Sequence, residues 1–234
     1  MIIEFFRKLW RFGKTVAGHV LNGEFALGVH AISGVLPRWL LRFNKGTLLY
    51  TGHFEFSGRL NPDIRTKLAD SSDIDEINRI SGVRKDHIRQ MMASGAVCYM
   101  GRLEDGSFSS IAWSAFNKCF VRGLGYARDF GPTGHYTFGL YTLPETRKKG
   151  LNMALFSESV KHANAKGFSD LFSIVEFTNR YALNFHLKCG YRPLSQITYL
   201  KIFCLRLTAD YDILAGKSSL KLFLREPRGD VTVI

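Results

Sequence analysis

The residues with the clearest chemical meaning form the stretch Leu143–Met153, which reads LPETRKKGLNM. Three basic side chains fall in a turn after a strand-like run, and a helical pattern begins at Asn152. A helix N-terminus presents unpaired N–H groups and the positive end of a dipole, and Gly150 lets the backbone approach a ligand closely. The stretch is a candidate phosphate-binding loop, with a solvated basic turn as the alternative. The basic residues are Arg147, Lys148 and Lys149.

A second stretch, Asn179–Tyr191, places polar groups on one short helix. Asn179 follows an apolar run, so its amide can either bond a ligand or cap the helix. His186 stands seven positions further on, near the same helix face two turns later. An imidazole can exchange a proton near neutral pH, but a lone histidine is also a common packed or surface residue. These residues alone leave both alternatives open at each position.

The surrounding elements predict a mixed α/β sheet flanked by helices. The strand Tyr136–Leu143, the helix Asn152–Lys166 and the strand Leu171–Phe177 form a β-α-β unit, and a right-handed crossover makes its strands parallel. Before them, Ala96–Leu103 and Phe108–Phe116 flank an Asp-Gly turn, which predicts an antiparallel hairpin. The other expected strands are Thr47–Phe56, Thr66–Ala69 and Thr198–Leu207, and the other expected helices begin after Ser71 or Ser72, at Arg84 and at Arg180.

Together the two stretches resemble the GNAT acetyltransferase family. The cofactor loop of that family reads R/Q-x-x-G-x-G/A, and here Arg147 and Gly150 hold its first two positions while Asn152 stands where glycine or alanine is usual. The second signature of the family reads N-x-x-A-x-x-x-Y-x-K-x-G-F, and His186 stands at its tyrosine. Its other matching positions are Asn179, Ala182, Lys188 and Gly190, with Tyr191 in place of phenylalanine. The resemblance covers roughly residues 66–207.

The resemblance implies the GNAT fold and an acyl-CoA-dependent N-acyltransferase. The expected reaction moves acetyl from acetyl-CoA to the primary amine of a small acceptor, such as an amino sugar or an amino-acid derivative, by direct attack. It implies His186 as the acid that protonates the departing thiolate, and no metal. The implied cofactor-binding residues are Leu140, Tyr141, Thr142, Leu143, Arg147, Lys148, Lys149, Gly150, Leu151, Asn152, Met153 and Asn179. For the general base, Glu176 and His135 are the first candidates, followed by Glu145, Asp129 and Tyr136.

Composition narrows the class of protein. The 234 residues are 46% hydrophobic and 22% charged, which excludes wholesale disorder and provides a core. The net charge of +12 favours anionic partners, but nucleic acid is not expected, because no helix-turn-helix, zinc-finger or RNA-binding motif is present. The four cysteines lack zinc or disulfide spacing, which indicates free thiols in the cytoplasm. No uncharged run is long enough to span a bilayer, and no signal peptide is expected.

The chain divides into three zones by sequence. Residues 1–57 form a basic, aromatic-rich extension, 58–208 the acyltransferase domain, and 209–234 a tail that packs on the core or extends from it. The extension resembles those of GNAT proteins encoded with polysaccharide-biosynthesis genes. Its run Val35–Phe43 places Arg38 and Arg42 on one helix side, so it fits either a helix packed on the domain or one lying on the inner face of an anionic membrane.

Two further functions compete with acetyl transfer to a small amine. A long-chain acyltransferase at the membrane face has the same fold but prefers long acyl-CoA. A non-catalytic CoA-binding or interaction module is compatible with Asn152 and His186 at the two positions that depart from the family pattern. A homodimer is an open alternative, since many GNAT relatives dimerise.

Overall fold

The computed structural model of the chain describes residues 25–35, 41–52, 54, 60–121, 126–202, 205–223 and 232–233. The basic segment 1–24, residues 36–40 of the amphipathic run Val35–Phe43, and Cys204 lie outside these residues. No helix in the described ranges combines the length and the apolar character needed to cross a membrane.

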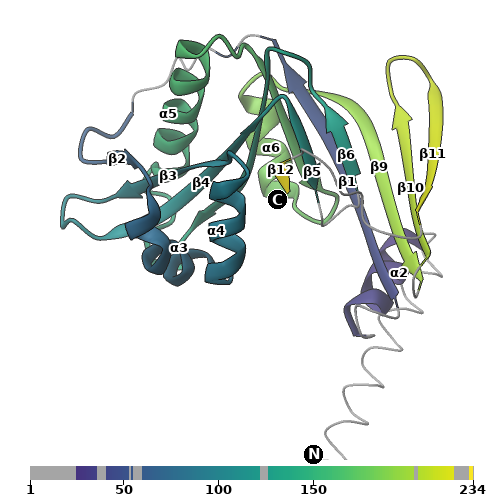
Figure 1. The fold of residues 1–234 in the computed structure, drawn as a ribbon, viewed down its shortest axis with the longest axis horizontal. Coiled ribbons are helices and arrows are strands. Elements are labelled where there is room, and N and C mark those ends of the chain that lie inside the picture. Colours follow the sequence, from purple (N-terminus) through teal and green to yellow (C-terminus); the bar gives the residue numbers. More distant parts are fainter. Residues whose placement is uncertain are drawn as a thin grey trace, which may run out of the picture.

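The described chain contains both helices and strands, and strands that follow one another directly make up much of it (Figure 1). The helices are α2 (Phe25–Val35), α3 (Ile74–Ser81), α4 (Lys85–Ala93), α5 (Leu151–Ala165) and α6 (Arg180–Lys188), with short 3-10 helices η1 (Ser71–Asp73) and η3 (Pro144–Thr146). The strands are β1 (Leu41–Thr51), β2 (Arg65–Leu68), β3 (Val97–Arg102), β4 (Phe108–Phe116), β5 (Lys118–Val121), β6 (Tyr126–Asp129), β7 (Gly134–Thr142), β8 (Asp170–Glu176), β9 (Arg192–Ile202), β10 (Leu205–Asp212), β11 (Lys217–Phe223) and β12 (Thr232–Val233).

One large mixed sheet organises the fold. Its strand order is β11-β10-β9-β1-β8-β7-β4-β3-β2, and a small sheet has the order β12-β5-β6. In the large sheet β7 and β8 are parallel, and the other neighbouring strands are antiparallel. The predicted fold class is therefore confirmed, with a β3–β4 hairpin leading into the parallel unit β7–α5–β8.

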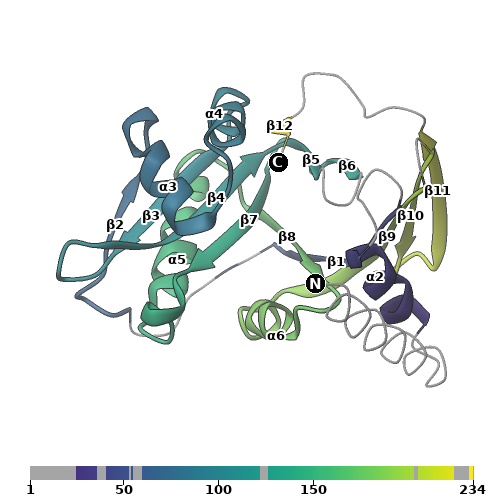
Figure 2. The ribbon, with the colours of Figure 1, turned by 90° about the horizontal axis from the view of Figure 1, so that it is seen from below.

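Helices cover both faces of the large sheet (Figure 2). On one face, Phe156 of α5 and Tyr191 after α6 pack on Leu171 and Val175 of β8. On the other face, the apolar sides of α3 and α4 pack on β3 and β4 in a second cluster. The small sheet lies on this same face, where Cys119 of β5 joins a cluster that reaches across β8, β1 and β9. Apolar residues on both faces of the central strands explain their nearly continuous apolar sequences.

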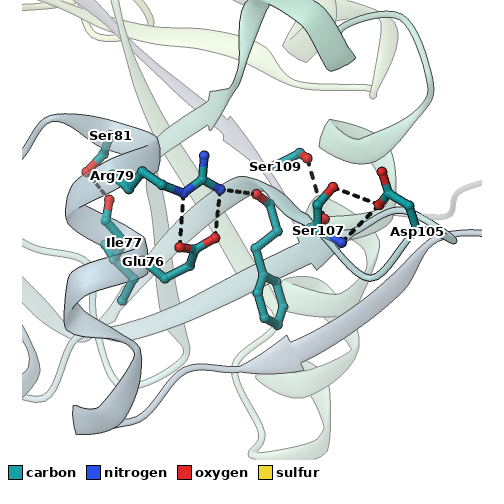
Figure 3. Close-up of polar contacts among 8 residues, drawn as sticks. Glu76, Ile77, Arg79, Ser81, Asp105, Ser107 and Ser109 are labelled. Carbon is teal, nitrogen blue, oxygen red and sulfur yellow. Dashed lines mark hydrogen bonds and ion pairs between the residues drawn. The ribbon is translucent and has the colours of Figure 1, made fainter.

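The β3–β4 hairpin and its attachment to α3 show why local signals predict this region well (Figure 3). In the turn, Asp105 Oδ1 accepts hydrogen bonds from Ser107 N at 2.9 Å and Ser107 Oγ at 2.7 Å. Arg79 on α3 donates to both carboxylate oxygens of Glu76, at 2.7 and 3.0 Å, and to the carbonyl of Phe108 at 2.6 Å. The guanidinium thus joins α3 to the first residue of β4.

The structure differs from the sequence predictions in several places. In place of the predicted strand Thr198–Leu207, the structure has two antiparallel strands, β9 and β10. β9 begins six residues before the predicted start, because the side chains of Ser195, Ile197 and Tyr199, at every second position, are buried in the core. The stretch 117–135, expected to be irregular, contains β5 and β6. The strand predicted over Thr47–Phe56 is β1, which begins at Leu41, ends at Thr51 and lies inside the large sheet, between β8 and β9. Arg42 and Phe43, expected on a helix, therefore lie on this strand.

Candidate active site

Two parallel strands, β7 and β8, diverge at the centre of the candidate site. β7 and β8 pair only from Gly134 with Asp170 to Thr137 with Ser173. Beyond that point β7 stays on β4 and β8 stays on β1, so the two strands diverge toward their C-terminal ends (Figure 2). Their facing edges no longer bond to each other there. This gap has two strand edges whose N–H and C=O groups can bond an extended ligand.

A bulge in β7 lies directly after the point of divergence. Phe138 pairs with Trp113 of β4 and Tyr141 with Ile111, so Gly139 and Leu140 oppose Ala112 alone. Gly139 has a φ of +57°, and a Cβ atom there would lie 3.1 Å from Trp113 Cδ1. Glycine is thus needed both for the backbone conformation and for the contact. A bulge interrupts the ladder, which releases backbone groups of Gly139 and Leu140 from pairing with β4.

The loop from β7 to α5 has the geometry of an anion cradle. Lys148 and Gly150 have φ values of +66° and +90°, and Gly150 is an N-cap without a side-chain hydrogen bond. The first N–H groups of α5, which begins at Leu151, therefore have no side-chain cap. The basic side chains before it are exposed. Beside them is a depression of about 360 Å³, lined by Leu60, Asn61, Pro62, Lys148, Lys149, Gly150 and Met153.

Asn152, which departs from the family pattern, has a defined role in this loop. The Thr142 hydroxyl at the end of β7 donates to Asn152 Oδ1, and Ser110 Oγ of β4 lies 2.7 Å from Thr142 Oγ1 and 3.4 Å from Asn152 Oδ1. The Asn152 side chain is thereby turned toward the sheet, and it joins the first turn of α5 to both strands. Arg147 Nε donates to the Thr142 carbonyl at 3.3 Å. These contacts fix the start of α5 over the end of β7.

On α6, the structure places Asn179 and His186 in structural contacts. Asn179 Oδ1 accepts from Ala182 N at 3.1 Å as the N-cap of α6. His186 is 6% exposed, and its Nδ1 lies 2.8 Å from the Ala182 carbonyl oxygen. Burial among Phe156 and Tyr191 lowers the pKa of the His186 imidazole below its ordinary value, while the hydrogen bond to Ala182 opposes that shift. The role of His186 as the acid stays a prediction, and it requires the ring to gain a proton that burial disfavours.

The two candidate bases lie in very different surroundings. Glu176 is exposed at the C-terminal end of β8, on the diverging part of the strand. His135 is 0% exposed, with Nε2 at 2.7 Å from Ser114 Oγ and its ring stacked on Phe116. Burial lowers the pKa of His135 to about 3, so the ring is neutral and closed to solvent. Of the further candidates, Tyr136 is buried, while Glu145 and Asp129 are exposed, the latter paired with Lys118 at 3.2 Å.

Sequence reasoning missed Ser110, and it named Thr142 as a cofactor-binding residue without its contact to Ser110. Ser110 and Thr142 are buried and contact each other across β4 and β7. A small hydroxyl residue within an apolar strand is the one signal that could have identified Ser110, but it does not reveal the partner. Within the described ranges, no group of three histidine, cysteine or acidic side chains could hold a metal ion.

Comparison with known proteins gives a family match over part of the chain and similar solved structures. Residues 86–191 match the model of the acetyltransferase (GNAT) family. No curated protein matches the sequence. The match runs from α4 to Tyr191, so it includes β7, the cradle, α5, β8 and α6, and it leaves out β1, β9 and β10.

Solved structures are similar to this chain at low sequence identity. A GNAT-family protein from Novosphingobium aromaticivorans is 17% identical over 67% of this chain and 63% of its own, with a TM-score of 0.49. A Drosophila protein is 11% identical over 74% of this chain and 54% of its own, with a TM-score of 0.51. A tandem GNAT protein from the clavulanic acid biosynthesis pathway is 10% identical over 69% of this chain and 54% of its own, with a TM-score of 0.50. This chain thus spans less than two thirds of the length of each.

Proposed function

Because residues 86–191 match the model of the GNAT acetyltransferase family, we propose that this chain is an N-acetyltransferase that moves an acetyl group from acetyl-CoA to the primary amine of a small acceptor. The divergence of β7 and β8 beside the uncapped start of α5 is the observation that carries the proposal. The gap between the strands suits an extended thioester arm, and the anion cradle lies at one end of this gap.

In this proposal the donor binds along β7. Backbone N–H groups at the start of α5 hold the diphosphate, with Arg147, Lys148 and Lys149 adding charge. The pantetheine arm lies in the gap and bonds the edge of β7 that faces away from β4, from Leu140 to Leu143, directly after the bulge at Gly139. The thioester then reaches the point where β7 and β8 meet. The amide nitrogen of Asn179, whose oxygen caps α6, is available to the arm.

The chemistry needs one proton removed and one supplied. The neutral amine nitrogen attacks the thioester carbonyl carbon, a C–N bond forms, and the C–S bond breaks with its electron pair going to sulfur. The amine loses one proton, and the thiolate takes up one to leave as CoASH. Glu176 is proposed as the base, directly or through water, because its carboxylate is exposed at the mouth of the gap. His135 is not assigned this role, since it cannot exchange protons with an acceptor while fully buried.

Donor binding is tested by melting temperature with acetyl-CoA, CoA and palmitoyl-CoA. A ligand at about 100 times its Kd adds about 2.7 kcal/mol to the free energy of unfolding. A rise with acetyl-CoA and CoA is expected. A rise with palmitoyl-CoA alone would replace acetyl transfer by long-chain transfer, and no rise with any of the three would end the proposal.

The proton-transfer roles are tested by turnover. With amine acceptors, Glu176→Gln is expected to lower kcat by about 10²- to 10⁴-fold at neutral pH, without changing acetyl-CoA binding. His186→Phe retains an aromatic ring against Phe156, so it separates packing from proton donation. Unchanged kcat in His186→Phe would remove His186 as the acid, and unchanged kcat in Glu176→Gln would remove Glu176 as the base.

A further inference from the structure

The last paired position between β7 and β8 carries two hydroxyl side chains. Thr137 of β7 pairs with Ser173 of β8, and the strands diverge directly after this pair. The β8 residues two positions before and after Ser173 pack beside α5 and α6, so Ser173 lies on that face of the sheet. Thr137 lies on the same face, because its neighbours Tyr136 and Phe138 pack on the opposite face, beneath the small sheet and α3. The inner end of the gap therefore has two hydroxyls on the side of the sheet that α5 covers.

The Ser173 hydroxyl is buried but makes only a long hydrogen bond. Its side chain is 4% exposed, and its Oγ donates to the carbonyl of Thr137 at 3.3 Å. Hydrogen bonds between oxygens are usually about 2.7–2.8 Å long, and a buried hydroxyl that lacks a good partner costs about 1–3 kcal/mol. The protein thus leaves much of the donor capacity of Ser173 unused.

The Thr137 hydroxyl has a hydrogen without an acceptor. Thr137 is 3% exposed, and its Oγ1 lies 3.4 Å from His135 Nε2, which lies 2.7 Å from Ser114 Oγ. His135 Nδ1 is buried and has no hydrogen-bond partner in the described ranges. A buried N–H group without an acceptor is rarer than a bare lone pair, so the ring proton is assigned to Nε2 and donated to Ser114. Nε2 then cannot accept from Thr137, and no other described residue does so.

The donor arm reaches this pair in the proposed binding mode. The cradle lies at the start of α5, which covers the same face as the two hydroxyls. From Thr142, at the end of β7, back to Thr137 the strand is roughly 16 Å long. The pantetheine arm is a chain about as long as four to five peptide residues, which spans roughly 15 Å when extended. An arm with its diphosphate on the cradle therefore places its sulfur beside Thr137 and Ser173.

We infer that the hydroxyls of Thr137 and Ser173 donate hydrogen bonds to the sulfur of the departing CoA. The inference rests on the proposed acetyl transfer. When the C–S bond breaks, its electron pair goes to sulfur, and the negative charge develops where the two donors converge. Hydrogen bonds to a charged group are stronger than those to a neutral one, and donors already in place where charge develops lower the barrier.

The two hydroxyls keep their protons throughout this step. An aliphatic hydroxyl is a weaker acid than a thiol, so it stabilises the thiolate without protonating it. The proton of the amine goes to Glu176, and the thiolate takes up a separate proton from His186 or water to leave as CoASH. Stabilisation by two neutral donors means that no charged acid is needed while the C–S bond breaks, which suits the burial of His186.

The first test measures the thiolate-to-thiol ratio of CoA bound to saturated protein, by ultraviolet absorbance of the thiolate at a fixed pH. Ser173→Ala and Thr137→Val should each lower this ratio at least about tenfold relative to the wild type. Thr137→Ser retains the hydroxyl and should retain the wild-type ratio. Ser195→Ala is the matched control and should change nothing, because Ser195 is a buried serine of β9, which β1 separates from β8.

A second measurement separates this role from a structural one. Desulfo-CoA lacks the sulfur atom, so its affinity should be the same in the wild type, Ser173→Ala and Thr137→Val. In turnover with an amine acceptor, Ser173→Ala should lower kcat by about 10- to 100-fold and leave the KM for acetyl-CoA unchanged. A rise in KM with an unchanged kcat would refute the inference.

The outcomes also separate this inference from the proposed function. Failure of CoA to raise the melting temperature of the wild type counts against the acyltransferase. Normal CoA binding with an unchanged thiolate ratio in both variants, or with an equal fall in Ser195→Ala, overturns the role of the two hydroxyls. A fall in Thr137→Ser as large as that in Thr137→Val, or equal weakening of CoA and desulfo-CoA binding, would overturn it as well.

Discussion

Removing the buried histidine of β7 should flatten the pH dependence of stability. Burial lowers the pKa of His135 to about 3 in the folded protein, whereas a histidine in an unfolded chain titrates near 6.5. Between these values the unfolded chain binds a proton that the folded protein does not bind. The free energy of unfolding therefore falls as the pH drops below about 6.5, and this loss is absent at higher pH.

The size of the effect follows from the same two values. Each pH unit below the unfolded pKa costs about 1.4 kcal/mol, so His135 accounts for about 2 kcal/mol of lost stability between pH 7.5 and pH 5.0. In His135→Asn the side chain has no proton to gain in this range, and its amide can still reach Ser114. Wild type should thus lose about 2 kcal/mol more than His135→Asn over this interval.

Urea unfolding at both pH values, followed by fluorescence, measures the difference. Ser114→Ala is the control, because it removes the 2.7 Å partner of His135 but keeps the imidazole. It should lower stability at both pH values and preserve the wild-type pH dependence. Equal losses in wild type and His135→Asn would show that His135 is protonated in the folded state, and the account of its burial would fail.

Three further substitutions test the site. Gly139→Ala should lower the free energy of unfolding by about 1–2 kcal/mol, because a φ of +57° is unfavourable for alanine and the added Cβ would crowd Trp113. Urea unfolding measures this loss. An unchanged KM for acetyl-CoA in the same variant would argue against donor binding at the bulge. Thr142→Val should lower the free energy of unfolding by about 1 kcal/mol and weaken acetyl-CoA binding, because it removes the hydroxyl that orients Asn152. In calorimetry, the double variant with Asn152→Ala should lose less stability than the sum of the two single variants. Full additivity would contradict the contact between the two side chains. Phe156→Ala should cost about 3–5 kcal/mol, because Phe156 on α5 is fully buried against β8. Chemical denaturation measures this cost, and a loss below about 1 kcal/mol would contradict the packing.

Local chemistry made the α/β core predictable from the sequence. The Asp-Gly turn marks the hairpin, Asn179 marks the start of α6, and Gly167 and Gly190 follow the ends of α5 and α6 with φ values of +84° and +82°. Each of these signals acts on residues only a few positions away, so the turn or helix end that it favours does not depend on tertiary contacts. The element boundaries around the cradle accordingly fall within a residue or two of those predicted.

Contacts between distant parts of the sequence could not be predicted in this way. The hydrogen bond of Asn152 depends on Thr142 and Ser110, which lie on different strands, and no spacing rule joins these three residues. The pairing of Arg42 with Lys201, and of Lys201 with Arg206, arises only when β1, β9 and β10 become neighbours. Tyr199 and Lys201 looked like ordinary members of one strand until the register placed them beside Asn44 and Arg42.

The position of β1 in the sheet has a consequence for folding during synthesis on the ribosome. Its two partners, β8 and β9, begin at Asp170 and Arg192, so a ribosome completes them well over a hundred residues after β1. Until then an apolar strand with two open edges is exposed to other chains, which favours aggregation and a need for chaperones during synthesis. Pairings of such long range also make folding slow. A shortened version beginning after residue 57 would lack the strand that joins β9, β10 and β11 to the rest of the sheet.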